Sequence, residues 1–168
     1  MTRVIDKRMT AEMDGDFVVF LIGMRFNRLW KPWKCFPVFT SMARLLRELA
    51  NKPESGFLAA DLYFGSVRRP MLVQYWRSFE HLHTYARSHD ETHWPVWVNF
   101  NKRIGSSGDV GIWHETYLVR AGAYESVYNN MPPFGLGVAG RLVPAQGRKM
   151  TAKGRLKLTD ADDEQSSS

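Results

Sequence analysis

Histidine and tryptophan, side chains suited to acid–base or metal chemistry in an aromatic pocket, are concentrated in residues 71–100 (MLVQYWRSFEHLHTYARSHDETHWPVWVNF). Four of the five histidines and three of the six tryptophans lie there. Imidazole changes its charge near neutral pH and is a common metal ligand. We therefore expect any chemistry of this protein to involve this stretch.

His93 is the first candidate, because it follows His89 by four residues and precedes Trp97 by four. On a continuous helix these three side chains share one face. An imidazole among aromatic rings could ligate heme iron or act as a general base. The structural alternative is that His93 packs against Trp97 and bonds to the backbone.

His114 is the second candidate and lies in residues 110–119 (VGIWHETYLV), which are typical of a strand. Strand alternation places His114 on the face opposite Trp113 and Glu115. A buried histidine or glutamate in a central strand needs a partner. Each of these residues is therefore either a site group or a structural residue with its hydrogen bonds satisfied.

Arg25 and Asn27 share one face of the strand expected at residues 16–27 (DFVVFLIGMRFN). An arginine among apolar neighbours is either an anion clamp or a member of an ion pair at an interface. Both faces of this strand are apolar, so both must be covered. Helices cover one face of such a sheet, and a second subunit is the simplest cover for the other.

The expected elements follow the order strand, helix, strand, strand, helix, strand, which is the split-βαβ, ferredoxin-like α+β pattern. The first strand is residues 16–27, and the others are 57–66, 71–76 and 110–119; the helices are 38–51 and 78–104. We expect residues 1–15 to form a flexible arm, 16–140 to form the domain and 141–168 to be a disordered tail.

Composition excludes several classes of partner and compartment. The net charge is +6, but much of the excess lies in the basic segment 141–157, and no nucleic-acid-binding motif is present, so we expect no nucleic-acid partner. No apolar run approaches the roughly 20 residues of a membrane helix, so we expect no membrane partner. The single Cys35 forms no internal disulfide, which favours a cytoplasmic protein.

Motifs of several common enzyme classes are absent. The sequence has no G-x-S-x-G elbow, H-E-x-x-H or C-x-x-C motif. Residues 135–140 (GLGVAG) look like a dinucleotide loop, but no strand precedes them and no helix follows them in the expected pattern. Serine hydrolysis, structural zinc and a self-bound nicotinamide are therefore not expected.

Four segments resemble the DUF4188 group, also labelled monooxygenase af470-like, of the dimeric α/β-barrel superfamily. They are DFVVFLIGMRFN, QYWRSFEHLHTYAR, THWPVW and VGIWHETYLV with the following YESVYNNMPPFGLG, and the resemblance covers about residues 16–140. It implies a ferredoxin-like subunit with an antiparallel sheet that packs face to face against a second copy. It also implies a pocket between sheet and helices.

The resemblance leaves the chemistry open, since this superfamily includes cofactor-free quinone-forming monooxygenases, heme-degrading oxygenases and heme-dependent aldoxime dehydratases. Heme-degrading members use an asparagine on the first strand, an aromatic residue in the second helix and a histidine further along it. Asn27, Tyr85 and His93 occupy comparable places here, with tyrosine in place of the usual tryptophan.

We therefore expect a homodimeric monooxygenase that oxidises an apolar aromatic or polyketide-like substrate with O2, without a cofactor. The base is His93 or His114, and Arg25 and Asn27 stabilise the developing oxyanion. The walls of the pocket are aromatic: Trp76, Tyr85, Trp97 and Trp113. Two alternatives stay open. One is a heme enzyme of the aldoxime dehydratase or heme oxygenase type with His93 as axial ligand, and the other is a non-catalytic dimer that binds a small apolar ligand.

Overall fold

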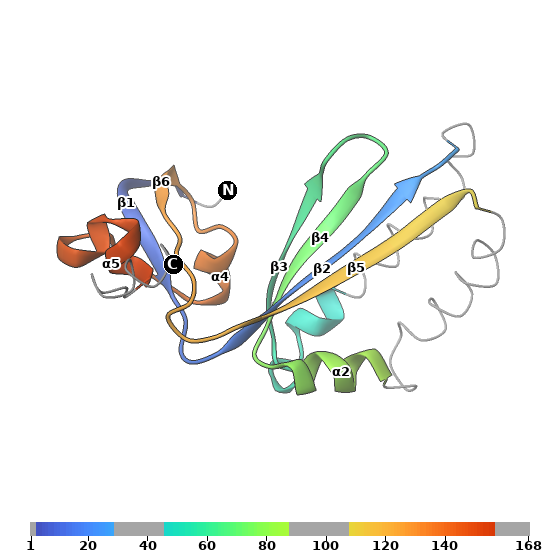
Figure 1. Cartoon of the computed structure of the whole chain (residues 1–168), viewed down its shortest axis with the longest axis horizontal. Coiled ribbons are helices and arrows are strands. Elements are labelled where there is room, and N and C mark those ends of the chain that lie inside the picture. Colours follow the sequence, from blue (N-terminus) through green and yellow to red (C-terminus); the bar gives the residue numbers. More distant parts are fainter. Residues whose placement is uncertain (1–2, 29–45, 88–107, 157–168) are drawn as a thin grey trace, which may run out of the picture. The chain divides into compact units, whose positions relative to one another are not determined.

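The computed structural model describes residues 3–28, 46–87 and 108–156 of the chain (Figure 1). These residues divide into two compact units. The first unit is Val18–Leu118, and the second combines Met1–Phe17 with Val119–Ser168.

The first unit is built on a four-stranded sheet with the strand order β3-β4-β2-β5. Its strands are β2 (Phe17–Phe26), β3 (Phe57–Phe64), β4 (Pro70–Trp76) and β5 (Val110–Val119). Strand β4 pairs antiparallel with both β2 and β3. This order, with two central strands that are not consecutive in the chain, is that of the ferredoxin-like fold, so the predicted α+β class and antiparallel sheet are confirmed.

Helix α2 (Phe79–Arg87) follows β4, and residues 46–50 are also helical. Both lie against the same side of the sheet (Figure 1). Leu49 and Leu82 pack there with Val18 and Trp76 in one buried cluster. The remaining residues of the two expected helices, 38–45 and 88–104, lie outside the described part of the chain.

The sheet has two distinct faces, set by the two-residue period of its strands. In β4, Leu72, Gln74 and Trp76 are buried, whereas the alternating Val73 and Tyr75 are only half-buried. We call the side that carries the buried set the helix-facing face, and the other side the second face. The register pairs Phe20 with Gln74 and Gly23 with Met71, so the same division continues across β2.

The turn between β4 and α2 uses Ser78, as its position before the helical residues predicts. The Ser78 hydroxyl lies 2.9 Å from Nδ1 of His81 and accepts from the His81 backbone N–H at 3.4 Å. The His81 ring also packs over Gly56, which adopts a positive φ of 74°. A side chain at Gly56 would collide with that ring, so this turn requires glycine.

The second unit contains a three-stranded sheet with the order β6-β1-β7. Its elements are β1 (Ile5–Glu12), β6 (Tyr128–Met131), α4 (Leu136–Ala139), β7 (Arg141–Pro144), η3 (Gly147–Met150) and α5 (Ala152–Leu156). The expectations of a flexible arm over 1–15 and of a tail disordered from residue 141 were therefore wrong for the parts the structure describes. Residues 157–168 of the expected tail lie outside those parts.

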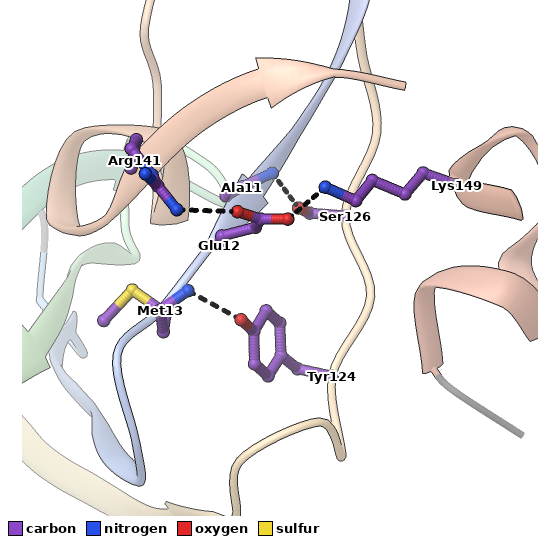
Figure 2. Close-up of polar contacts among 7 residues, drawn as sticks. All are labelled: Ala11, Glu12, Met13, Tyr124, Ser126, Arg141 and Lys149. Carbon is purple, nitrogen blue, oxygen red and sulfur yellow. Dashed lines mark hydrogen bonds and ion pairs between the residues drawn. The ribbon is translucent and has the colours of Figure 1, made fainter. Parts of the chain in front are cut away.

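Charged side chains explain why these segments are ordered despite their few apolar residues (Figure 2). Glu12, at the end of β1, accepts a hydrogen bond from Arg141 Nη2 at 3.0 Å and another from Lys149 Nζ. The backbone N–H of Met13 donates to the Tyr124 hydroxyl at 2.7 Å. Arg155 is 6% exposed in its side chain and donates to Glu125 at 2.7 Å. Three basic residues of the segment that was expected to be a disordered tail, Arg141, Lys149 and Arg155, are thus paired with acidic side chains.

None of the helices that the structure describes is both long enough and apolar enough to cross a lipid bilayer.

Candidate functional site

Trp76, the last residue of β4, lies on the helix-facing face, where it is completely buried. Its ring centroid lies 5.3 Å from that of Phe57, edge to face, and 5.4 Å from that of Tyr85. Its indole N–H donates to Oε1 of Gln74 at 3.0 Å. Trp76 was predicted to contact the substrate, but in this structure its surface is covered by its neighbours.

His114 projects from β5 onto the same helix-facing face and is exposed. Its ring centroid lies 5.8 Å from that of Phe20, with 41° between the ring planes. Phe20 packs against the buried cluster that includes Trp76, and so does Tyr85. The structure thus brings His114, Trp76 and Tyr85 to one face, on three different elements.

Trp113 lies on the second face, where its indole ring covers Gly23 of β2. A Cβ atom at Gly23 would lie 2.8 Å from three atoms of that ring. Glu115 and Tyr117 follow on the same face, since the Tyr117 hydroxyl donates to Glu115 Oε2 at 2.5 Å. This hydrogen bond to a carboxylate raises the pKa of Tyr117. The alternation inferred for β5 is therefore confirmed.

Asn27 and Arg25 also belong to the second face. The Asn27 side chain donates to the Gly108 carbonyl at 2.9 Å, and its backbone N–H donates to the Asp109 carbonyl at 2.9 Å. Asn27 therefore joins the end of β2 to the start of β5. Arg25 is exposed. A pocket on one face cannot contain His114 together with Arg25 and Asn27, because the sheet separates them.

A buried acid that the sequence pattern did not single out, Asp109, immediately precedes β5. The carboxylate of Asp109, 2% exposed, pairs with Nη1 of Arg28 at 3.1 Å. A buried carboxylate requires such a partner, because its desolvation is otherwise costly. Together with Asn27, this pair fixes the edge of the sheet where β2 and β5 meet.

His93 and Trp97 lie outside the described residues, so their predicted roles stay predictions. Within the described ranges 3–28, 46–87 and 108–156, no group of three or more His, Cys, Asp or Glu side chains is arranged to hold a metal ion. The described histidine on the helix-facing face of the sheet is His114.

Gln74 is the buried polar residue on this face that the sequence interpretation missed. It is 5% exposed, and it stands opposite Phe20 in the register of β2 and β4. A signal was present in the sequence, because Gln74 alternates with Trp76 in an otherwise apolar strand (MLVQYW). An amide in such a position must be satisfied by a partner or used by a ligand.

The second unit has a cleft of about 270 Å³ beside β1. Its charged lining is balanced, with Glu12, Asp14 and Glu125 facing Arg141, Lys149 and Arg155. The hydrogen bond from Lys149 is the main reason that the pKa of Glu12 is lowered, and Arg141 adds to the effect. These groups neutralise one another, so the cleft has the character of a structural ion-pair network.

Comparisons with known proteins agree with this fold. The chain is 32% identical over 139 residues to Monooxygenase af470 of Aspergillus fumigatus, and the match covers 73% of this chain and 46% of that protein. The chain thus spans about half the length of this relative.

The chain also superimposes on two solved structures. An aldoxime dehydratase in complex with butyraldoxime superimposes with a TM-score of 0.57 at 17% identity, over 82% of this chain and 38% of that one. SnoaB, a cofactor-independent oxygenase from Streptomyces nogalater, gives a TM-score of 0.43 at 13% identity, over 62% of this chain and 94% of its own.

The family match covers residues 17–136, which extend from β2 through all four strands of the ferredoxin-like sheet to the start of α4. More than half of the sequence is included. The chain therefore belongs to the monooxygenase af470-like family.

Proposed function

We propose that this chain is a monooxygenase that oxidises an apolar aromatic or polyketide-like substrate with O2 and without a bound cofactor. The observation that carries the proposal is the helix-facing face of the sheet, where the imidazole of His114 stands beside the aromatic cluster of Phe20, Trp76 and Tyr85. Membership of the monooxygenase af470-like family supports the reaction class.

In the proposed reaction, His114 removes a proton from an activated phenol or from a methylene group beside a carbonyl or aromatic rings. The resulting anion supplies the electrons that reduce O2. For a methylene group, one molecule of O2 converts the carbon to a ketone and yields one molecule of water. One oxygen atom therefore enters the substrate, and the other leaves as water with the two hydrogens of the methylene group. Aromatic walls favour this chemistry because they keep bulk water from the reactive anion.

His93 remains the second proposed base, and a heme axial ligand in the alternative reaction. An experiment with an activated probe separates these possibilities. Anthrone has a methylene group between two aromatic rings, opposite a ketone, and its oxidation consumes O2. We expect the purified protein to accelerate O2 uptake by anthrone without added metal or hemin, and His114→Ala to lower kcat by about 10²- to 10⁴-fold.

Tyr117→Phe is the matched control, because Tyr117 lies on the same strand as His114 but on the second face. It is expected to keep the wild-type rate. Full turnover in His114→Ala would exclude His114 as the base. Turnover that appears only with hemin, with a Soret band that is lost in His93→Ala, would replace the cofactor-free reaction with heme chemistry.

We also propose that the protein is a homodimer in which the second face of each sheet packs against its copy. The half-buried apolar side chains Val19, Leu21, Val73 and Tyr75 support this, since they form a continuous apolar surface across β2 and β4. Analytical ultracentrifugation is expected to give twice the 19.4 kDa mass of the chain. A monomer at micromolar concentration would contradict the proposal.

A further inference from the structure

The side-chain NH2 group of Gln74 is a hydrogen-bond donor on the helix-facing face, and it has no role in the proposed reaction. Its side chain is 95% buried, since 5% of its surface is exposed. It lies in β4, opposite Phe20 and two residues before Trp76. An amide at such a position is costly to bury unless its polar atoms are used.

The orientation of this amide is fixed by Trp76. An indole N–H can only donate, so the atom that it meets at 3.0 Å must be the carbonyl oxygen of Gln74. The NH2 group therefore points away from Trp76. Among the residues that the structure describes, Trp76 is the single hydrogen-bond partner of the Gln74 side chain.

The surroundings of Gln74 indicate what the NH2 group can bind. Phe20 lies between Gln74 on one neighbouring strand and His114 on the other. Adjacent strands are separated by about 4.8 Å, so the backbones of β4 and β5 are about 10 Å apart. A flat ring system over Phe20 would span this distance, with one edge toward Gln74 and the other toward His114.

We propose that Gln74 is a substrate-binding residue whose NH2 group donates a hydrogen bond to a carbonyl or phenolate oxygen on an aromatic ligand. Trp76 is the positioning residue that fixes the amide with its NH2 group toward the ligand. This inference rests on the proposed function for the class of ligand. It adds that the site selects oxygenated ring systems over hydrocarbons of the same shape.

A pair of ligands tests this selectivity without any turnover. Anthrone and 9,10-dihydroanthracene have nearly the same tricyclic shape, but only anthrone carries a carbonyl oxygen. Their affinities are measured by calorimetry under nitrogen, where anthrone is not oxidised. We expect the wild type to prefer anthrone by about 10-fold or more, because only anthrone accepts the hydrogen bond from Gln74, whereas dihydroanthracene leaves the buried NH2 group unsatisfied.

In Gln74→Met, which keeps the size of the side chain and removes the amide, the preference should fall about 5- to 10-fold. The affinity for dihydroanthracene should stay within about 2-fold of wild type. In Trp76→Phe, Gln74 is retained but its amide is no longer held in one orientation. The preference for anthrone over dihydroanthracene should therefore fall, but by less than in Gln74→Met. An unchanged preference in Gln74→Met, or no binding of either ligand by the wild type, would overturn the proposal.

A second measurement needs no variant, in case Gln74→Met does not fold. The side-chain NH2 resonances of Gln74 in ¹⁵N-labelled wild type should shift on addition of anthrone and not on addition of dihydroanthracene. Resonances that respond equally to both ligands would overturn the inference. Oxygen uptake is recorded separately, so selective binding without uptake would contradict the monooxygenase activity and leave the role of Gln74 standing.

Discussion

Gly23 offers a sharp test of how the sheet faces are assigned. The indole of Trp113 lies so close that a Cβ atom at Gly23 would stand 2.8 Å from Cε2, Cζ2 and Nε1 of the ring. Carbon atoms in contact prefer about 3.5–4.0 Å, so Gly23→Ala must displace the ring by roughly 1 Å. Such overpacking costs about 1–3 kcal/mol.

Alanine also restricts the unfolded chain, which returns about 0.5–1 kcal/mol of stability relative to glycine in a strand. The net expectation for Gly23→Ala is a loss of about 1–2 kcal/mol in the free energy of unfolding. For a chain of this length that loss lowers Tm by roughly 2–8 °C. Thermal unfolding followed by circular dichroism measures it directly.

Gly111 is the matched control because it lies on the same face, on β5, with Asn27 Nδ2 at 3.9 Å from its constructed Cβ. Ordinary contact at this distance predicts that Gly111→Ala keeps or slightly raises the stability. In a Trp113→Leu background the penalty of Gly23→Ala should largely vanish, which gives a coupling energy of about 1–2 kcal/mol.

Equal stability of Gly23→Ala and Gly111→Ala, with no coupling to Trp113, would refute the placement of the indole over β2. The oxygen-uptake assay adds a functional control. Since Trp113 and His114 occupy opposite faces, Gly23→Ala should leave the rate per folded molecule within about 2-fold of wild type. A loss of turnover equal to that of His114→Ala would mean that the two faces are not independent.

The charge and burial of single residues lead to three more expected outcomes. The pKa of Glu12 is lowered in the folded protein, chiefly by the hydrogen bond from Lys149. The stability that ionised Glu12 contributes is therefore fully present above the unfolded pKa of about 4.3, and it is lost as the pH falls through the folded pKa. Urea unfolding should therefore show Glu12→Gln about 1 kcal/mol less stable at pH 7, with a smaller difference at pH 3; an equal difference at both would contradict it. The pKa of Tyr117 should fall toward 10.0 in Glu115→Gln, which ultraviolet titration would detect, because the accepting carboxylate is removed. Leu49 is 1% exposed in the core, so Leu49→Ala should lower the free energy of unfolding by about 2–5 kcal/mol. In the same assay, Leu118→Ala should change this free energy by less than about 0.5 kcal/mol, because Leu118 is exposed.

The ferredoxin-like sheet could be predicted because its signals are local. The strand expected at 110–119 has these bounds in the structure, and the one expected at 71–76 begins one residue earlier. Alternation of apolar residues is visible within a single strand. The chain order of these strands and helices then restricts the sheet to very few topologies.

The second unit could not be predicted in this way. Strand β1 is mostly polar, with Asp6, Lys7 and Arg8 exposed, and it pairs with β7, which is about 130 residues away. Nothing in its own sequence identifies that partner. The ion pairs of Glu12 with Arg141 and Lys149 also join residues that are far apart in the sequence. Local composition therefore does not distinguish a disordered basic tail from an ordered segment whose charges are paired.

The sequence predicted the strands that hold the candidate residues, but not which of these residues lie together on one face of the sheet. Strand alternation places His114 and Glu115 on opposite faces of β5. Because the faces of paired strands continue across the sheet, it also places His114 on the face opposite Arg25 and Asn27 of β2. A pocket on the helix-facing face therefore has to be assembled from side chains of that face. Gln74 was missed because a neutral amide has no titration or metal chemistry to draw attention to it.

The separation of the two faces also limits how an anion could be stabilised next to His114. The described strand residues of the helix-facing face include no lysine or arginine, and the polar donors among them include the neutral Gln74 amide. A fixed cation would hold a phenolate strongly in the ground state as well as in the transition state. A neutral donor stabilises the oxyanion less, and it leaves the electron density of the anion available for transfer to O2. The proposed site is therefore expected to favour substrates whose own rings delocalise the charge, as an extended oxygenated aromatic system does.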